Sequence, residues 1–299
     1  MTVTEDAASP ANPARPVRAI APPDPDAVAR VVEAALAEDL GDGDPTSDGL
    51  FAPEATATMS LLVKEPGTVA GLPVVAAVFA ALDGAVVVTA LAADGDVIAA
   101  VPAEIARIYG PARALLAGER TALNLLGRLS GIATLTARCV AELEGTDATL
   151  LDTRKTTAGL RDLEKYAVRC GGGTNHRFNL GAALLVKDNH KRLAGGVAVA
   201  AIKLRRTHPE LSLEVEAETL NEVRACLDAG VDRILLDNMA PDELRAAVAL
   251  CAGRARTEAS GGITLANLRA VAATGVDFVS LGALTHSAKA LDVSLEVVL

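Results

Sequence analysis

The second half of the chain alternates short apolar runs with helical patterns. Six runs rich in aliphatic residues are typical of buried strands: Ala148–Leu151, Ala182–Val186, Leu211–Val215, Arg233–Leu236, Arg256–Ala259 and Val276–Leu281. Amphipathic patterns that indicate helices follow three of them: Leu220–Ala229, Pro241–Ala252 and Leu265–Ala273. This alternation predicts parallel βα units, and so a barrel-like α/β domain.

Carboxylates recur at a fixed interval within this repeat. Glu216, Asp237 and Glu258 are separated by 21 residues each, so we expect them at the same carboxyl-terminal edge of adjacent strands. Barrel enzymes build their active sites at that edge. Two small loops there, Ser260-Gly261-Gly262 and Gly282-Ala283-Leu284, lead into helical patterns whose free N–H groups can hold a phosphate.

A basic segment interrupts the otherwise acidic chain. Between Arg154 and Arg192 there are nine Lys and Arg residues against three acids, although the formal net charge of the chain is -10. Arg161, Lys165 and Arg169 are spaced four apart on a predicted helix and are interpreted as a solvated face. The other cations stand at strand ends, where they converge, so we expect an anionic ligand near Arg154, Lys155, His176, Arg177 and Lys187. Together with the carboxylates, this favours an anion plus a metal ion.

Length and composition limit the remaining possibilities. The 299 residues, 51% of them hydrophobic, suit one large domain and a smaller one. The first 27 residues hold six of the 14 prolines and are interpreted as a disordered tail, not an export signal. No apolar run is long enough for a membrane span. The cysteines lack disulfide or zinc-site spacing and indicate a reducing cytoplasm: Cys139, Cys170, Cys226 and Cys251.

A separate α/β domain is predicted ahead of the barrel. Its strand-like stretches and helical patterns are Thr58–Glu65, Val86–Ala92, Val97–Ile108, Ala27–Leu40 and Pro111–Leu143. Within the long helix, Arg120 and Arg128 have apolar neighbours. From this context alone, such an arginine more often caps a core than binds a ligand.

Nine short runs, in order along the chain, carry a resemblance to one enzyme family: Glu119–Asn124, Asp152–Thr156, Glu164–Val168, Gly171–Arg177, Lys187–His190, Glu214–Glu216, Leu235–Asn238, Ser260–Gly262 and Gly282–His286. From about Ala27 to its end, the chain resembles the quinolinate phosphoribosyltransferases. The resemblance implies an N-terminal α/β sandwich domain joined to an open, incomplete α/β barrel, with the active site at a dimer interface. The expected division is a tail (1–26), a sandwich domain (27–130, completed by 287–299) and a catalytic barrel (131–286).

The family activity is what the resemblance implies for this chain. Phosphoribosyl pyrophosphate and quinolinate would react, with Mg²⁺ and with decarboxylation, to nicotinate mononucleotide, pyrophosphate and CO2 in NAD biosynthesis. Arg154, Arg177 and Lys187 would bind the two quinolinate carboxylates, and His176 would line the same pocket. Arg120 would reach in from the neighbouring subunit of a homodimer or higher homo-oligomer.

The resemblance also implies how the second substrate is held. Lys155 would meet phosphoribosyl pyrophosphate, and Glu216 and Asp237 would hold its ribose and Mg²⁺. Glu214 is expected to face the opposite side of the strand from Glu216, which makes it the weaker candidate ligand. The terminal phosphate would be held by Ser260, Gly261, Gly262 and Gly282, with His286 nearby.

Two positions depart from the family pattern, and three other functions stay open. Ala182 stands where Asp is common and Ala158 where Pro is frequent, which leaves the local loop geometry undetermined. Lys155 or Lys187 would act as a Schiff-base lysine if its pKa were depressed, as in an aldolase. A nucleic-acid-binding module would lack stacking platforms, with aromatic residues at 2%. A paralogue of the same fold would act on another pyridine or anion.

Overall fold

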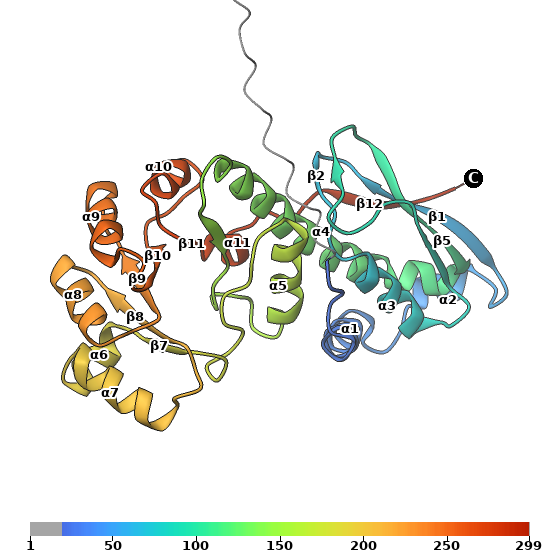
Figure 1. Cartoon of the computed structure of the whole chain (residues 1–299). Coiled ribbons are helices and arrows are strands. Elements are labelled where there is room, and N and C mark those ends of the chain that lie inside the picture. The colour runs from blue at the N-terminus through green and yellow to red at the C-terminus, as the bar shows by residue number, and fades with distance from the viewer. Residues whose placement is uncertain (1–19, 299) are drawn as a thin grey trace, which may run out of the picture.

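The computed structural model describes residues 20–298. The predicted disordered tail, residues 1–26, lies outside the described residues up to residue 19. Two sheets organise the chain, and one long helix, α4 (Ala112–Glu142), runs from the first sheet to the second (Figure 1).

The first sheet has four antiparallel strands in the order β12-β1-β5-β3. Its strands are β1 (Thr56–Val63), β3 (Val87–Ala90), β5 (Ala103–Pro111) and β12 (Val293–Val297). A second, small pair is β2 (Gly67–Thr68) with β4 (Val97–Ile98). Helix α4 packs against this sheet, and α3 (Leu72–Leu82) and α1 (Pro25–Leu40) pack against α4, while α2 (Pro45–Leu50) lies at its start (Figure 1).

The second sheet has six parallel strands in the order β6-β11-β10-β9-β8-β7. The strands are β6 (Thr149–Leu151), β7 (Leu184–Val186), β8 (Leu213–Ala217), β9 (Arg233–Asp237), β10 (Arg256–Ser260) and β11 (Phe278–Ser280). The surrounding helices are α5 (Arg161–Cys170), α6 (Asp188–Ala194), α7 (Val197–Thr207), α8 (Leu220–Asp228), α9 (Pro241–Cys251), α10 (Leu268–Ala272) and α11 (Ala283–His286). Over the described residues β6 and β7 do not pair, so the predicted α/β barrel is open.

Local signals explain where the barrel helices begin. Before α8, Thr219 Oγ1 accepts the N–H of Glu222 at 3.2 Å, and Glu222 accepts the N–H of Glu218 at 2.7 Å. This reciprocal capping satisfies amides that have no partner inside the helix. Helix α9 begins at Pro241, where a missing N–H is tolerated. Helices α6 and α7 were not predicted, because Gly195 and Gly196 interrupt the helical pattern between them.

The end of the chain returns to the first sheet. Strand β12 pairs with β1, with Leu295 opposite Leu61. On the way it crosses α4 at two glycines: Leu291 donates its N–H to the Gly127 carbonyl at 2.8 Å, and a Cβ on Gly131 would lie 2.0 Å from Lys289 O. Only glycine fits this crossing. The predicted domain boundary at residue 130 falls within α4 and stays a prediction.

Candidate active site

Cationic side chains gather at the open edge of the barrel. We call the site of Arg154, Arg177 and the nearby Lys187 the cationic pocket. Thr174 makes one parallel bridge to Leu151 of β6, and this carries the following residues toward the gap before β7. Arg154 and Arg177 are near enough there for their charges to interact: burial and the Arg154 guanidinium lower the pKa of Arg177. Arg154 Nε is buried with no hydrogen-bond partner in the described part of the chain. Two close guanidinium groups and a free donor indicate that the pocket binds an anion.

A buried ion pair lies behind this pocket. The Lys165 ammonium contacts the Asp152 carboxylate, and both side chains are buried. Burial raises the pKa of Asp152 and lowers that of Lys165, and the partner charge opposes each shift. The interpretation of Lys165 as part of a solvated face was therefore wrong: α5 is covered on this side by the 171–177 segment, which no helical spacing reveals.

The two other cations of α5 are only half-buried, yet they also have fixed partners. Arg161 donates from Nε to Thr156 Oγ1 at 3.1 Å. Arg169 donates to Asn175 Oδ1 at 2.9 Å, and its guanidinium lies 5.4 Å from the ring centre of Tyr166. They brace the loops of the pocket, so the interpretation as a freely solvated face was wrong for these residues too.

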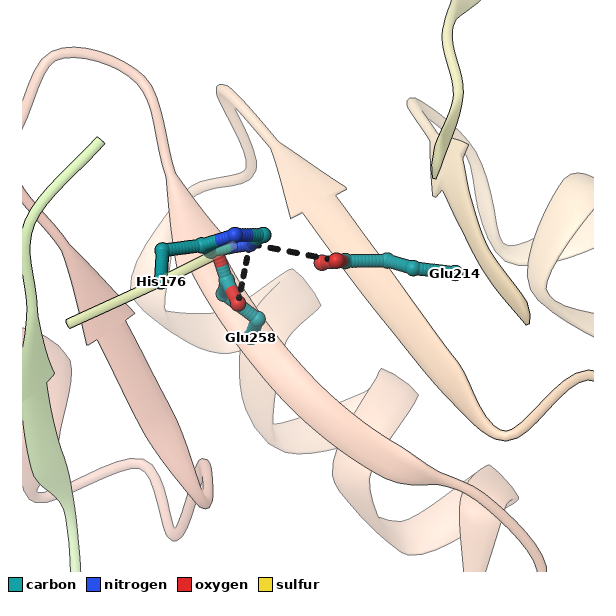
Figure 2. A group of neighbouring side chains, drawn as sticks. All are labelled: His176, Glu214 and Glu258. Atoms are coloured by element: carbon teal, nitrogen blue, oxygen red, sulfur yellow. Dashed lines mark ion pairs between the residues drawn. The ribbon is translucent and has the colours of Figure 1, made fainter. Parts of the chain in front are cut away.

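His176 lies between two buried carboxylates inside the barrel (Figure 2). Its Nε2 is 3.1 Å from Glu214 Oε2 and 3.4 Å from Glu258 Oε2. The expectation that Glu214 faces away from Glu216 was wrong, because residues two apart on a strand share a face. The expectation that Glu258 lies at the barrel edge was also wrong: its side chain is fully buried, where it contacts His176 and Arg233.

Opposing effects act on the protonation of this group. Burial disfavours the charged imidazole and the two carboxylates favour it, and these effects alone would raise the pKa of His176 to about 9. The amide of Arg177 acts against protonation, because it donates to Nδ1 at 2.7 Å and so requires an unprotonated Nδ1. The ring in this structure is therefore neutral, with its proton on Nε2. Burial raises the pKa of Glu214, whereas His176 and Arg233 outweigh burial at Glu258 and lower its pKa.

An acidic pair lies at the edge of the barrel. Glu216 is half-buried near the end of β8, and Asp237 ends β9. Burial and the charge of Asp237 raise the pKa of Glu216, which also accepts the N–H of Asp188 at 3.2 Å. Lys187, the exposed residue before α6, partly offsets this shift. Two partly exposed carboxylates that repel each other form an oxygen donor set that fits Mg²⁺.

The glycine loop after β10 packs closely against the loop after β9. Asn238 has a left-handed backbone, with φ 54°, and donates its N–H to Ser260 O at 2.9 Å. Gly261 has φ +88°, and a Cβ there would lie 2.4 Å from Asn238 Oδ1. With Gly262 these residues line one side of a cavity of about 300 Å³, and the rest of its lining is mostly apolar, with Leu244 of α9 and Val271 of α10.

The loop after β11 brings together three further predicted residues. A Cβ on Gly282 would lie 2.9 Å from Lys155 Cδ and 3.1 Å from His286 Nε2. Thr285 Oγ1 fixes the loop by donating to the Lys155 carbonyl at 2.8 Å. Lys155 and His286 are exposed, so their side chains are free to meet a ligand. The Schiff-base alternative needs a desolvated lysine, and Lys155 and Lys187 are both exposed.

Arg120 and Arg128, two of the arginines of α4, differ in their surroundings. Arg128 contacts the buried Glu164 at 2.7 Å and donates to Thr285 O and Ala288 O, so it caps the core as predicted. Arg120 is exposed, and no contact joins it to the cationic pocket within residues 20–298.

An apolar groove of about 1000 Å³ lies between α1 and α3. Its one charged lining residue is Glu33, so the groove does not suit an anion.

Comparison with known proteins accounts for this arrangement. The family model described as quinolinate phosphoribosyl transferase, N-terminal domain, matches residues 44–130, and that of the C-terminal domain matches residues 132–296. The chain belongs to the quinolinate phosphoribosyltransferase family. This confirms the resemblance found in the sequence, and the α/β fold with an open barrel agrees with it.

Two curated relatives and one solved structure cover most of this family member. The probable nicotinate-nucleotide pyrophosphorylase (carboxylating) of Bacillus subtilis (strain 168) is 45% identical over 263 residues, covering 88% of this chain and 90% of that protein. The corresponding enzyme of Mycobacterium leprae (strain TN) is 40% identical over 279 residues, covering 91% and 98%. The structure of nicotinate-nucleotide pyrophosphorylase from Francisella tularensis has a TM-score of 0.88 and 39% identity, covering 91% and 96%.

In this quinolinate phosphoribosyltransferase family member, the contacts that hold the cationic pocket were not predicted from the sequence. They involve Asp152, Asn175 and Arg233, together with Lys165 and Glu258, for which other surroundings were expected. A signal was present for some of them: Asp152 and Lys165 lie in runs shared with the family, and Glu258 is a charged residue in a buried strand. Buried charges in such positions need partners, and this requirement predicts a network.

Among residues 20–298, no helix combines the length and the apolar character that crossing a bilayer would require.

Proposed function

We infer that this protein transfers the phosphoribosyl group of phosphoribosyl pyrophosphate to quinolinate, with decarboxylation, as a step of NAD biosynthesis. Family membership over both domains supports the reaction. The observation that carries the substrate assignment is the pair Arg154 and Arg177, with the buried Nε of Arg154, which has no hydrogen-bond partner among the described residues. A dicarboxylate suits two adjacent guanidinium groups better than a monocarboxylate does.

The cationic pocket is the proposed site of the pyridine substrate. Arg154, Arg177 and Lys187 bind its two carboxylates, and His176 lines the pocket wall. The ring nitrogen, held in this way, attacks the anomeric carbon of the ribose. Holding both reactants in this geometry removes much of the entropic cost of the reaction.

The acidic pair and the small loops are the proposed site of phosphoribosyl pyrophosphate. Glu216 and Asp237 hold the ribose hydroxyls and are the residues that would hold Mg²⁺, which neutralises charge on the pyrophosphate. Lys155 meets the pyrophosphate from the other side. The terminal phosphate is held by the loop residues Ser260, Gly261, Gly262, Gly282 and, nearby, His286.

The chemistry then follows without a covalent enzyme intermediate. The nitrogen lone pair forms the bond to the anomeric carbon as the carbon–oxygen bond to pyrophosphate breaks, and Lys155 stabilises the charge on the leaving group. The alkylated ring nitrogen is positive. The adjacent carboxylate leaves as CO2, because the electron pair left on the ring carbon lies beside that positive nitrogen, and a solvent proton completes the product.

A second copy of the chain completes this site in our proposal. Arg120 is exposed, and within residues 20–298 no contact joins it to the cationic pocket of its own chain. This suits a role in the partner's site. If so, Arg120→Ala recovers activity in mixed dimers with a subunit that has intact Arg120 and a barrel-site lesion; no recovery would assign Arg120 to its own subunit. A cytoplasmic location stays a proposal, supported by four free, buried cysteines.

The direct test incubates the purified protein with quinolinate, phosphoribosyl pyrophosphate and Mg²⁺, and follows nicotinate mononucleotide by mass spectrometry. Nicotinate serves as the parallel substrate. We expect product from quinolinate alone, and none when Mg²⁺ is chelated. No product from either pyridine, with folded protein, would contradict the proposed reaction.

A further inference from the structure

His176 is held at all four of its polar atoms by other parts of the protein. Its N–H donates to Asp152 Oδ1 at 2.8 Å, and its carbonyl accepts from Lys165 Nζ at 3.1 Å. In the ring, Nε2 lies 3.1 Å from Glu214 Oε2, and Nδ1 accepts the N–H of Arg177 at 2.7 Å. No ring nitrogen therefore remains for a bound substrate.

The group of His176, Glu214 and Glu258 also has the composition of a metal site, with one ligand atom of each within 4.8 Å of the others. Two contacts argue against an ion there. Arg233 already donates to Glu258 Oε2 at 3.0 Å, and its guanidinium lies 4.1 Å from the ring centre of Phe278. Because Nδ1 accepts an amide, the ring proton is on Nε2, which then has no lone pair to offer.

The hydrogen bond from the Arg177 N–H to His176 Nδ1 links the group of His176, Glu214 and Glu258 to the cationic pocket. Arg177 is partly buried beside a like charge, Arg154, so the two side chains repel each other in the absence of an anion. Within residues 20–298, one guanidinium hydrogen bond fixes its side chain, from Nη1 to Ala183 O at 2.9 Å. The backbone of Arg177 is fixed by the ring of His176, and the ring is fixed by the two carboxylates (Figure 2).

We propose that His176 is a positioning residue for Arg177 and makes no hydrogen bond to the substrate, and that Glu214, Glu258 and Arg233 hold it in this role. The inference rests on the proposed function, because it takes the pocket of Arg177 as the quinolinate site. A pre-organised guanidinium binds the carboxylate without first having to be ordered. These four side chains thus determine the affinity for the pyridine without contacting it.

A double-mutant cycle of quinolinate binding, measured by calorimetry, tests the proposal. It uses the full-length protein, His176→Gln, Arg177→Ala and the double variant, with phosphoribosyl pyrophosphate as the control ligand. Gln keeps an N–H near Nε2 for the carboxylates but lacks the acceptor at the Nδ1 position. His176→Asn, which keeps an acceptor there, is the conservative variant. If His176→Gln does not fold, as judged by thermal unfolding, Glu258→Gln takes its place in the cycle.

We expect His176→Gln to weaken quinolinate binding roughly tenfold, the size of one or two hydrogen bonds, and His176→Asn to weaken it less. Affinity for phosphoribosyl pyrophosphate should stay within about twofold, and the His176→Gln loss should vanish in the Arg177→Ala background. A loss that persists in full in that background would mean that His176 contacts the substrate, and would overturn the proposal. Wild-type protein that binds no quinolinate would overturn the proposed function and this assignment with it.

Discussion

The two halves of the barrel edge hold their functional groups in different ways. Around Arg154 and Arg177, buried side chains fix the loops through ion pairs, beginning with Asp152 and Lys165. Around Asp237 and Gly261, the backbone itself fixes the loops, through residues in the left-handed conformation and one close contact between two loops. The cationic half should therefore be sensitive to substitutions behind the site, and the glycine half to substitutions within it.

The largest effect is expected from breaking the support of the cationic half. Asp152→Asn leaves the Lys165 ammonium buried without a counter-charge, so the free energy of unfolding should fall by about 3–5 kcal/mol. Urea denaturation at pH 7 measures this. The double variant Asp152→Asn/Lys165→Met is the control and should recover much of the loss. A fall of less than about 1 kcal/mol in the single variant would show that the pair does not support this half.

The next largest effect concerns the cationic pocket itself. Arg154→Ala removes one of two adjacent guanidinium groups, so kcat/KM for quinolinate should fall by a factor of about 30 to 1000, or about 2–4 kcal/mol. Steady-state kinetics measure this, with KM for phosphoribosyl pyrophosphate expected to stay within about twofold. Arg206→Ala, at an exposed position of α7, is the matched control. Unchanged quinolinate turnover in Arg154→Ala would refute the pocket assignment.

A substitution in the glycine half should weaken the binding of phosphoribosyl pyrophosphate and leave quinolinate binding unchanged. Gly261→Ala forces a Cβ to within 2.4 Å of Asn238 Oδ1 at φ +88°, so affinity for phosphoribosyl pyrophosphate should fall about tenfold. Quinolinate affinity should not change. Gly230→Ala is the control, since Gly230 has φ +66° but open space around it. Equal losses in the two variants would mean that the loop contact at Gly261 has no role in binding.

The smallest effect is expected at the opposite end of the barrel strands, away from both halves. Thr257 and Arg256 outweigh burial and lower the pKa of Asp277 below the ordinary value of an aspartate, about 3.9. Its contribution to stability is therefore present above that value and is lost as pH falls through the lower pKa of the folded protein. Asp277→Asn should be less stable by about 1 kcal/mol at pH 7, with unchanged activity. The difference between the two proteins, measured by urea denaturation, should shrink in acid; a constant difference would contradict the assignment.

The sequence predicted the elements that local patterns determine. The six barrel strands appear where the apolar runs lie, and the glycine loops after β10 and β11 are where we expect them. The basic segment at the strand ends indicated the cations, and the family resemblance added the roles expected of them. Both signals are local in the chain.

The parts that the sequence did not predict depend on contacts between distant segments. Lys165 has the spacing of an exposed helical face, and only the covering segment with His176 buries it. Glu258 keeps the 21-residue interval, yet its side chain is buried against His176 and Arg233, which come from distant segments. Glu214 was the exception, since the two-residue period of a strand already puts it on the face of Glu216.

The most direct test of the two-half account is a crystal structure of the protein with quinolinate and phosphoribosyl pyrophosphate bound. We predict the pyridine carboxylates on Arg154 and Arg177, the terminal phosphate at Ser260–Gly262, and both ring nitrogens of His176 still in their internal contacts. Pyridine carboxylates bound at the glycine loops, with the cationic pocket holding the phosphate, would contradict the account.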